Sequence, residues 1–218
     1  WAMTRIDRLC RLAARAPRVA NWMLANRPAR WALEKTVGIA QGRKLPRISH
    51  RPFLHSKTAR RLRKPQRTTG AKVLLLVDTY ANYCDPQLAE ALVRVLEHNG
   101  VDVYIPEKQR EAGMPMISQG AVDPARRIAE INVPLLAEAV RQGYLVVSTE
   151  PSAVLTVRRE YPHLLAADND ALTAAEETFD ACHYLWHTHQ QGRLELDFQA
   201  VSLEVGYHAP CHLKALDV

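Results

Sequence analysis

Cysteine is scarce in this sequence of 218 residues, and its positions lack the spacing of any compact site. Paired cysteines would indicate a disulfide framework, and closely spaced Cys and His would indicate zinc, but neither pattern is present. The four cysteines are Cys10, Cys84, Cys182 and Cys211. We therefore predict a protein of a reducing compartment without a disulfide framework.

Long apolar runs are missing as well. The longest begins at Val73 and meets Asp78 after five residues, whereas a membrane-spanning helix needs roughly 18. The opening stretch WAMTRIDRLCRLAARAPR is interrupted by arginine, where a secretory signal needs an unbroken apolar core. We therefore predict a cytoplasmic protein, and the sequence leaves open an association with the cytoplasmic face of a membrane. Because the chain starts with Trp1 and stops at Val218 within a predicted helix, we expect a fragment of a longer protein.

Two catalytic motifs are also absent. No glycine-rich dinucleotide fingerprint follows a predicted strand, and the Gly-x-Ser-x-Gly motif of hydrolases does not occur. We therefore expect that the chain itself holds neither FAD nor a hydrolase nucleophile, and that it contributes no catalytic residue.

Acidic residues are nearly missing from the first third of the chain. Residues 1–70 hold 18 of the 29 Lys and Arg but only two of the 23 acids, Asp7 and Glu34, which leaves a balance of +16 there and −10 in the remainder. This asymmetry predicts two parts, a basic helical segment with a linker at 1–70 and an α/β domain at 71–218. The basic part fits binding to nucleic acid or an acidic membrane, and it also fits packing across the acidic remainder of its own protein.

Packing on its own protein is favoured because no nucleic-acid motif accompanies the charge. Apolar residues at helical spacing predict short amphipathic helices in the first part of the segment, and residues 38–69 predict an extended basic connector with three prolines. Trp22, Trp31 and Phe53 are expected to be the docking side chains. We expect no nucleic acid among the partners.

Residues 71–218 alternate between two kinds of pattern. Apolar runs predict strands, and apolar residues at helical spacing between proline and glycine predict helices. The predicted strands are 72–78, 101–105, 144–148 and 203–207, and the predicted helices are 86–100, 124–143, 154–165 and 170–191. This order predicts an α/β fold with a mostly parallel, Rossmann-like sheet and flanking helices.

The loops after these strands hold the residues able to carry chemistry, because reactive groups gather at the carboxyl ends of parallel strands. Cys84 lies at the turn of one loop, and Cys211 lies in another between His208 and His212. A metal-binding thiolate and an ordinary buried cysteine both fit this placement. The four loops expected to converge on one edge are 79–86, 107–120, 148–153 and 208–212.

Two further polar features have functional interpretations. His183 and His187 share a face of the predicted long helix beside Cys182 and His189, which fits a zinc site. A solvent-facing polar stripe explains the same spacing, with residues 184–186 on the packed face, and is favoured. Glu150 ends a strand and is expected to bond backbone amides of an adjacent turn.

Four of these stretches resemble a known family. TYANYCDP, EAGMPMISQG, EPSA and HAPCHLKAL are similar, in order and wording, to the loops of the cysteine-rich (CCG) domain. That domain is shared by one of the subunits of heterodisulfide reductase, the iron–sulfur subunits of glycolate oxidase and anaerobic glycerol-3-phosphate dehydrogenase, and the C-terminal part of fused FAD-linked oxidases. The resemblance covers residues 71–218. In the fused oxidases it extends back over residues 16–53, so the pattern is most similar to theirs.

In this family a first cysteine, a Cys-Cys-Gly and a later cysteine bind an iron–sulfur cluster, and this module occurs twice. The resemblance places Cys84 at the first ligand of one module and Cys211 at the first ligand of the next. Glu111 and Ala112 stand at the Cys-Cys pair, and Ala153 stands at the last cysteine. Because a cluster is normally held by about four thiolates, we expect the first module to be degenerate.

The resemblance implies the iron–sulfur electron-transfer part of a flavin-linked dehydrogenase that oxidises a small 2-hydroxy acid or a polyol phosphate. Cys211 would ligate a cluster in the complete protein, Cys84 is the weaker candidate, and His208 and His212 would donate hydrogen bonds to sulfur. FAD and a ferredoxin-like part are expected on another domain or subunit, with a quinone or another electron acceptor as partner. No cluster is expected to stay on this chain alone. The alternative is a non-catalytic interaction module whose basic segment docks an acidic partner or nucleic acid.

Overall fold

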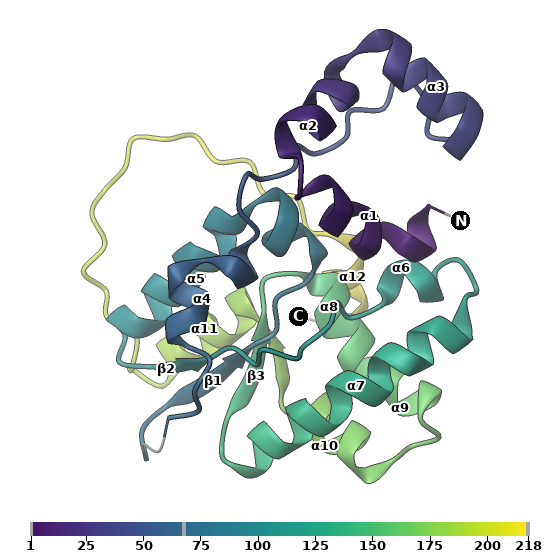
Figure 1. Cartoon of the computed structure of the whole chain (residues 1–218). Coiled ribbons are helices and arrows are strands. Elements are labelled where there is room, and N and C mark those ends of the chain that lie inside the picture. The colour runs from purple at the N-terminus through teal and green to yellow at the C-terminus, as the bar shows by residue number, and fades with distance from the viewer. Residues whose placement is uncertain (1, 67–68, 217–218) are drawn as a thin grey trace.

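A computed structural model describes residues 2–66 and 69–216, so Trp1 and Val218 lie outside the described residues. Its centre is a four-stranded parallel sheet in the order β2-β1-β3-β4 (Figure 1). The strands are β1 (Lys72–Leu75), β2 (Asp102–Tyr104), β3 (Leu145–Ser148) and β4 (Thr178–Asp180). The predicted α/β fold with a parallel sheet and flanking helices is confirmed.

Strand β1 lies in the middle of the sheet and is buried on both faces. Val73 and Leu75 pack into one core, and Leu74 packs into the other, because successive side chains of a strand point to opposite faces. The first core is covered by α4 (Lys57–Arg61), α5 (Pro86–His98) and α11 (Ala181–Gln190). The second is covered by α7 (Val122–Arg141), α8 (Pro151–Leu155), a π-helical turn η4 (Thr156–Glu160), α9 (Tyr161–Leu164) and α10 (Asn169–Glu176).

The prediction for the fourth strand was wrong. Residues 203–207 form no strand, and Leu203, Val205 and Tyr207 are 74–85% exposed in a stretch without regular structure. The fourth strand is instead β4, which divides the predicted helix 170–191 into α10 and α11. Asp180 accounts for the division because its side chain accepts a hydrogen bond from Cys182 N (2.9 Å) and so caps the start of α11.

The basic segment forms three helices at its start, α1 (Ile6–Ala13), α2 (Pro17–Ala25) and α3 (Arg27–Val37), of which α2 and α3 project from the body (Figure 1). Its later part packs on the domain, with Phe53 1% exposed in the first core. Arg61 and Arg63 form ion pairs with Glu97 and Glu107, both at 2.7 Å.

The predicted docking role is therefore confirmed for Phe53 and wrong for the two tryptophans. Trp22 is 61% exposed and Trp31 57% exposed, because α2 and α3 pack on each other at the end of the molecule where no sheet face is available to them. Within the described residues, no helix has both the length and the apolar character needed to cross a membrane.

Candidate functional site

Three of the four predicted loops meet at the carboxyl edge of the sheet. The chain leaves β1 through buried residues to Asp78, and Glu111 and Glu150 lie in the loops that follow β2 and β3. Hydrogen bonds join the loops directly, since Ala112 N donates to Asp78 Oδ1 (3.4 Å) and Ala81 N donates to Glu150 Oε1 (2.9 Å). The edge therefore carries three carboxyl groups at the place where the fold concentrates chemistry.

Asp78 is the buried member of this acidic group, and the partly buried Glu111 is linked to it through Thr79. Asp78 Oδ1 also accepts from Thr79 N (2.7 Å), and Thr79 Oγ1 donates to Glu111 Oε2 (3.2 Å). Burial raises the pKa of Asp78, and it raises the pKa of Glu111 to about 8 with further contributions from Asp7 and Asp78. Glu111 is therefore mostly protonated at neutral pH, a form unsuited to binding a cation.

Glu150 holds the turn that presents Cys84. Its carboxyl oxygens accept hydrogen bonds from Tyr80 N (3.4 Å) and Ala81 N (2.9 Å), at the start of the π-helical turn η3 (Tyr80–Cys84). This confirms the predicted bonding of Glu150 to backbone amides. Burial and the charge of Asp78 raise the pKa of Glu150 to about 8 despite these bonds.

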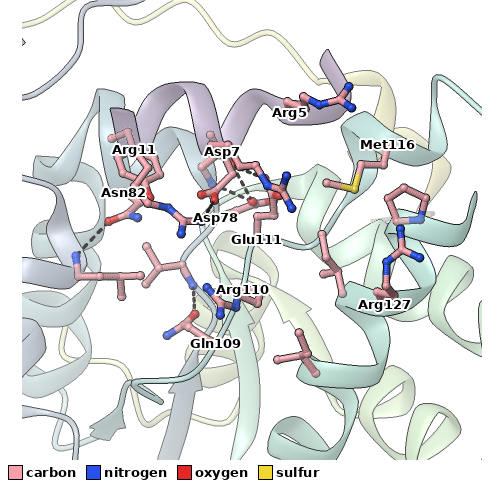
Figure 2. Close-up of a pocket in the computed structure, with 18 of the residues that line it drawn as sticks. Arg5, Asp7, Arg11, Asp78, Asn82, Gln109, Arg110, Glu111, Met116 and Arg127 are labelled. Carbon is pink, nitrogen blue, oxygen red and sulfur yellow. Dashed lines mark hydrogen bonds and ion pairs between the residues drawn. The ribbon is translucent and has the colours of Figure 1, made fainter. Parts of the chain in front are cut away.

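A cavity of about 910 Å³ opens beside the acidic group (Figure 2). Asp78 and Glu111 line it, and α1 and the first half of α7 contribute to its wall. Asp7 and Arg11 of α1 form an ion pair there. The cavity is rich in guanidinium groups, contributed by Arg5, Arg8, Arg11, Arg63, Arg110 and Arg127. The cavity is therefore polar, lined by arginines and by acids that are partly protonated. Such a lining differs from the thiolate-rich surroundings of a soft metal.

Cys84 contacts a partner that sequence reasoning missed. It ends η3 and packs against the buried Cys10 of α1 in a small cluster with Ile48 and Tyr83. The two side chains share a hydrogen bond, which lowers the pKa of the Cys84 thiol and, together with burial, raises that of Cys10. The main cause of the lowered pKa of Cys84 is therefore the second thiol.

The other two positions that the resemblance assigns to cluster ligands of the first module hold alanines. Ala112 and Ala153 are fully buried in the second core. The backbone around Ala112 is held by Tyr161, whose Oη donates to Ala112 O (3.0 Å) and accepts from Asn132 Nδ2 (2.9 Å). Gly113 follows with φ +91° at the N-cap of α6 (Met114–Ile117), a conformation that favours glycine. The residues of this module therefore do not fit an iron–sulfur cluster.

The prediction that the turn of Cys211 follows a strand was wrong. Residues 192–210 have no regular structure, so its turn does not follow a strand. Cys211 instead starts α12 (Cys211–Ala215), which packs against α8, and Leu216 is buried beneath it. Cys211 and His208 are exposed, and His212 is partly exposed.

The structure does not form the zinc site considered for α11. Cys182 and His187 are exposed, while His183 is partly buried with its ring 5.7 Å from that of Phe179. Of the predicted packed face, Tyr184 is buried but Trp186 is 58% exposed. Among residues 2–66 and 69–216, no group of three or more His, Cys, Asp and Glu side chains is placed to hold a metal ion.

Asp78 could have been found in the sequence, because an acid directly after a buried parallel strand is a strong signal. Cys10 gave no such signal. Its contact with Cys84 joins residues far apart in sequence, and neither residue's local pattern indicates the other.

Comparison with known proteins finds relatives that are similar in sequence to this chain. The chain is similar to one of the subunits of anaerobic glycerol-3-phosphate dehydrogenase. Against that protein from Escherichia coli K12 it is 31% identical over 199 residues, which is 91% of this chain and 49% of the relative. One of the subunits of the fumarate reductase (CoM/CoB) of Methanothermobacter marburgensis is 26% identical over 145 residues, 66% of this chain and 26% of that protein.

A third relative is lactate utilization protein A of an Exiguobacterium species, 27% identical over 148 residues, which is 66% of this chain and 58% of that protein. The chain thus spans about half the length of the first relative and less than two thirds of the others. No protein-family model matches the sequence, and no solved structure matches it.

Proposed function

We propose that this chain is part of the iron–sulfur electron-transfer unit of a flavin-linked dehydrogenase. The observation that carries the proposal is the convergence of the loops holding Cys84, Glu111 and Ala112 at one sheet edge, since these loops carry the resemblance to the CCG domain. The similarity to named subunits of a glycerol-3-phosphate dehydrogenase and a fumarate reductase supports a redox role. The substrate we propose is a small 2-hydroxy acid or a polyol phosphate.

Within this unit, the first module acts as a scaffold and not as a cluster site. Glu111, Ala112 and Ala153 replace three thiolates, and the alanines are built into the core. One cysteine with one largely protonated glutamate does not make a soft-metal site. What the module retains is the positioning of α8, against which α12 packs.

Cys211 is the residue of this chain that we assign to a cluster in the complete protein. Packing of α12 on α8 and burial of Leu216 hold this helix on the domain, and Cys211 at its start is exposed. His208 and His212 are close in sequence and can donate hydrogen bonds to sulfur, an effect that tunes cluster potential. The cluster would pass electrons from FAD, bound on another domain or subunit, toward a quinone or another acceptor.

The proposal is tested by comparing two cysteine variants in the intact enzyme. Cys211→Ser should lower iron content and slow electron transfer to the acceptor several-fold, while reduction of the flavin by substrate is unchanged. Cys84→Ser is the matched control, and it should leave iron content and transfer nearly unchanged because its module holds no cluster. Equal losses in the two variants would defeat the assignment, and a larger loss at Cys84 would reverse it.

A further inference from the structure

The contact between Cys10 and Cys84 brings together two thiols that no cluster uses. Cys10 comes from the middle of α1, and Cys84 comes from the end of η3 at the carboxyl edge of the sheet. Both are free thiols, and they meet in one packed cluster with Ile48 and Tyr83. A pair of thiols held in contact by two different elements is poised for disulfide formation, provided that one of them is accessible and ionised.

The two thiols differ in the ways that such chemistry requires. Cys10 is 7% exposed, whereas Cys84 is partly exposed. Their shared hydrogen bond favours the thiolate at Cys84 and the thiol at Cys10. Acids lie near both thiols, Asp7 and Glu111 by Cys10 and Asp85 and Glu150 by Cys84, and the guanidinium of Arg11 lies beside them in an ion pair with Asp7.

We propose that Cys84 and Cys10 form a peroxide-oxidised pair, in which Cys84 is the reacting thiol and Cys10 the resolving thiol. The Cys84 thiolate attacks one oxygen of hydrogen peroxide, the O–O bond breaks, and hydroxide leaves, so that Cys84 becomes a sulfenic acid. The sulfur of Cys10 then attacks that of Cys84. The S–O bond breaks, and water leaves with the proton of Cys10. Overall, two thiols lose two electrons, and one peroxide is reduced to two waters.

The disulfide would fix α1 to the loop that follows β1. Asp7, Arg8 and Arg11 of α1 line the cavity, so oxidation would lock one wall of the cavity against the sheet edge. Reduction by a cellular thiol would release it again. This role rests on the part of the proposed function that leaves Cys84 without a cluster, and it does not depend on the electron-transfer activity itself.

The experiment treats the full chain with hydrogen peroxide and maps the cysteines by mass spectrometry. We expect the intact mass to fall by two hydrogens and one cross-linked peptide pair to contain Cys10 and Cys84. Cys182 and Cys211, both exposed, serve as internal controls and should stay reduced under the peroxide dose that oxidises the pair. A cross-link between other cysteines, or oxidation of Cys182 or Cys211 before the pair, overturns the proposal.

Two variants separate the roles of the two thiols. Cys10→Ser removes the resolving thiol, so sulfenic acid should accumulate at Cys84, where dimedone traps it. Cys84→Ser should leave Cys10 unlabelled by dimedone, because the buried thiol does not react with peroxide itself. If dimedone labels Cys10 in the Cys84→Ser variant as strongly as it labels Cys84 in the Cys10→Ser variant, the assignment of Cys84 as the reacting thiol is wrong. Since iron is not part of the readout, a failure here leaves the electron-transfer proposal standing.

Discussion

Glu111 shows, at the scale of a single residue, how its surroundings change a carboxyl group at a position where the resemblance expects a thiolate. Its carboxyl group is held by Thr79 and lies near Asp78 and Asp7. Burial among acids favours the neutral form, so the residue serves as a hydrogen-bonding group of the cavity. An ordinary exposed glutamate would be charged at neutral pH.

This arrangement predicts a pH-dependent stability. The pKa of Glu111 rises from 4.5 to about 8 on folding, so the folded state retains a proton that the unfolded state loses. Its stabilising contribution is complete below about pH 4.5 and is lost as the pH rises to about 8. Glu111→Gln, which mimics the protonated acid, should flatten the fall in unfolding free energy over this range by up to roughly 1.4 kcal/mol per pH unit. Chemical denaturation at several pH values measures the slope.

Glu204→Gln provides the control for this measurement, because Glu204 is exposed in the stretch without regular structure. Its slope should equal that of the unchanged protein. If Glu111→Gln retains the original slope as well, Glu111 is charged in the folded state.

At the scale of elements, the basic segment divides into a packed part and a projecting part. Phe53 and α4 join the first core, while α2 and α3 extend away from the sheet. The ion pairs of Arg61 and Arg63 to the acidic domain are exposed and contribute little by themselves. Apolar burial at Phe53 is therefore the main attachment of the packed part.

The two parts should respond differently to loss of an aromatic side chain. Phe53→Ala should lower the free energy of unfolding by about 3–5 kcal/mol, because it leaves a cavity in a closed core. Trp22→Ala, in the same basic segment, should change it by less than about 0.5 kcal/mol because the indole is mostly exposed. A comparable loss at Trp22 in urea denaturation would show that α2 packs on a surface that is buried in solution.

The elements also show how far sequence reasoning reached. The apolar runs that begin at Val73 and Tyr144 predicted their strands correctly. Both strands are buried on two faces, and a continuous apolar run is typical of such strands. Strand β4 was missed because its three residues follow an alanine-rich helix without a proline or glycine between them. The convergence of Cys84 and Glu111 followed from strand order, whereas the contact of Cys10 with Cys84 depends on how α1 docks, which no local pattern encodes.

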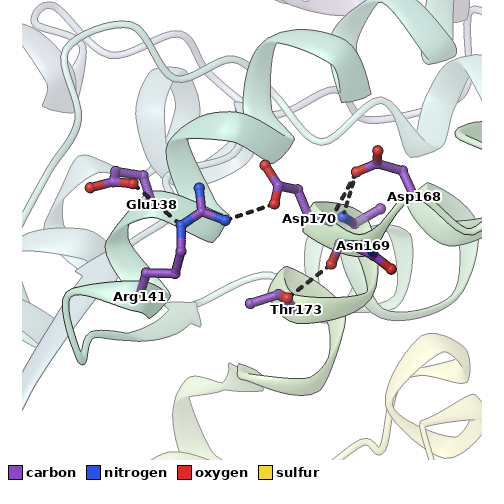
Figure 3. Close-up of polar contacts among 7 residues, drawn as sticks. Glu138, Arg141, Asp168, Asn169, Asp170 and Thr173 are labelled. Carbon is purple, nitrogen blue, oxygen red and sulfur yellow. Dashed lines mark hydrogen bonds and ion pairs between the residues drawn. The ribbon is translucent and has the colours of Figure 1, made fainter.

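Polar contacts on the outside of the second core also include some that the sequence does not predict. Arg141 of α7 forms an ion pair with Asp170 of α10 at 2.7 Å and a second with Glu138 at 3.4 Å (Figure 3). Asp168 caps α10 by accepting from Asp170 N (2.9 Å). The cap has a sequence signature, but the ion pair between helices depends on their packing.

At the scale of the whole molecule, the scaffold interpretation predicts that the isolated chain does not assemble a cluster. Purified without oxygen and supplied with iron and sulfide, it should hold far fewer than the four irons of a complete cluster. The reason is that three ligand positions carry Glu111, Ala112 and Ala153. Iron analysis and the visible absorption of the reconstituted protein measure the outcome.

A gain-of-function variant makes this result decisive. The triple replacement Glu111→Cys, Ala112→Cys and Ala153→Cys restores the thiolates and should raise the iron retained per chain. Stable binding of a full cluster by the unchanged chain would show that the first module does bind a cluster.

The position of Phe53 also has a consequence for the order of events during synthesis. The core that it joins includes Ala181 and Tyr184 of α11, which the ribosome adds about 130 residues later. At roughly 5–20 residues per second, this side chain waits about 6–26 s for its pocket to be completed. During that interval a strongly cationic nascent segment has no acidic domain to cover it.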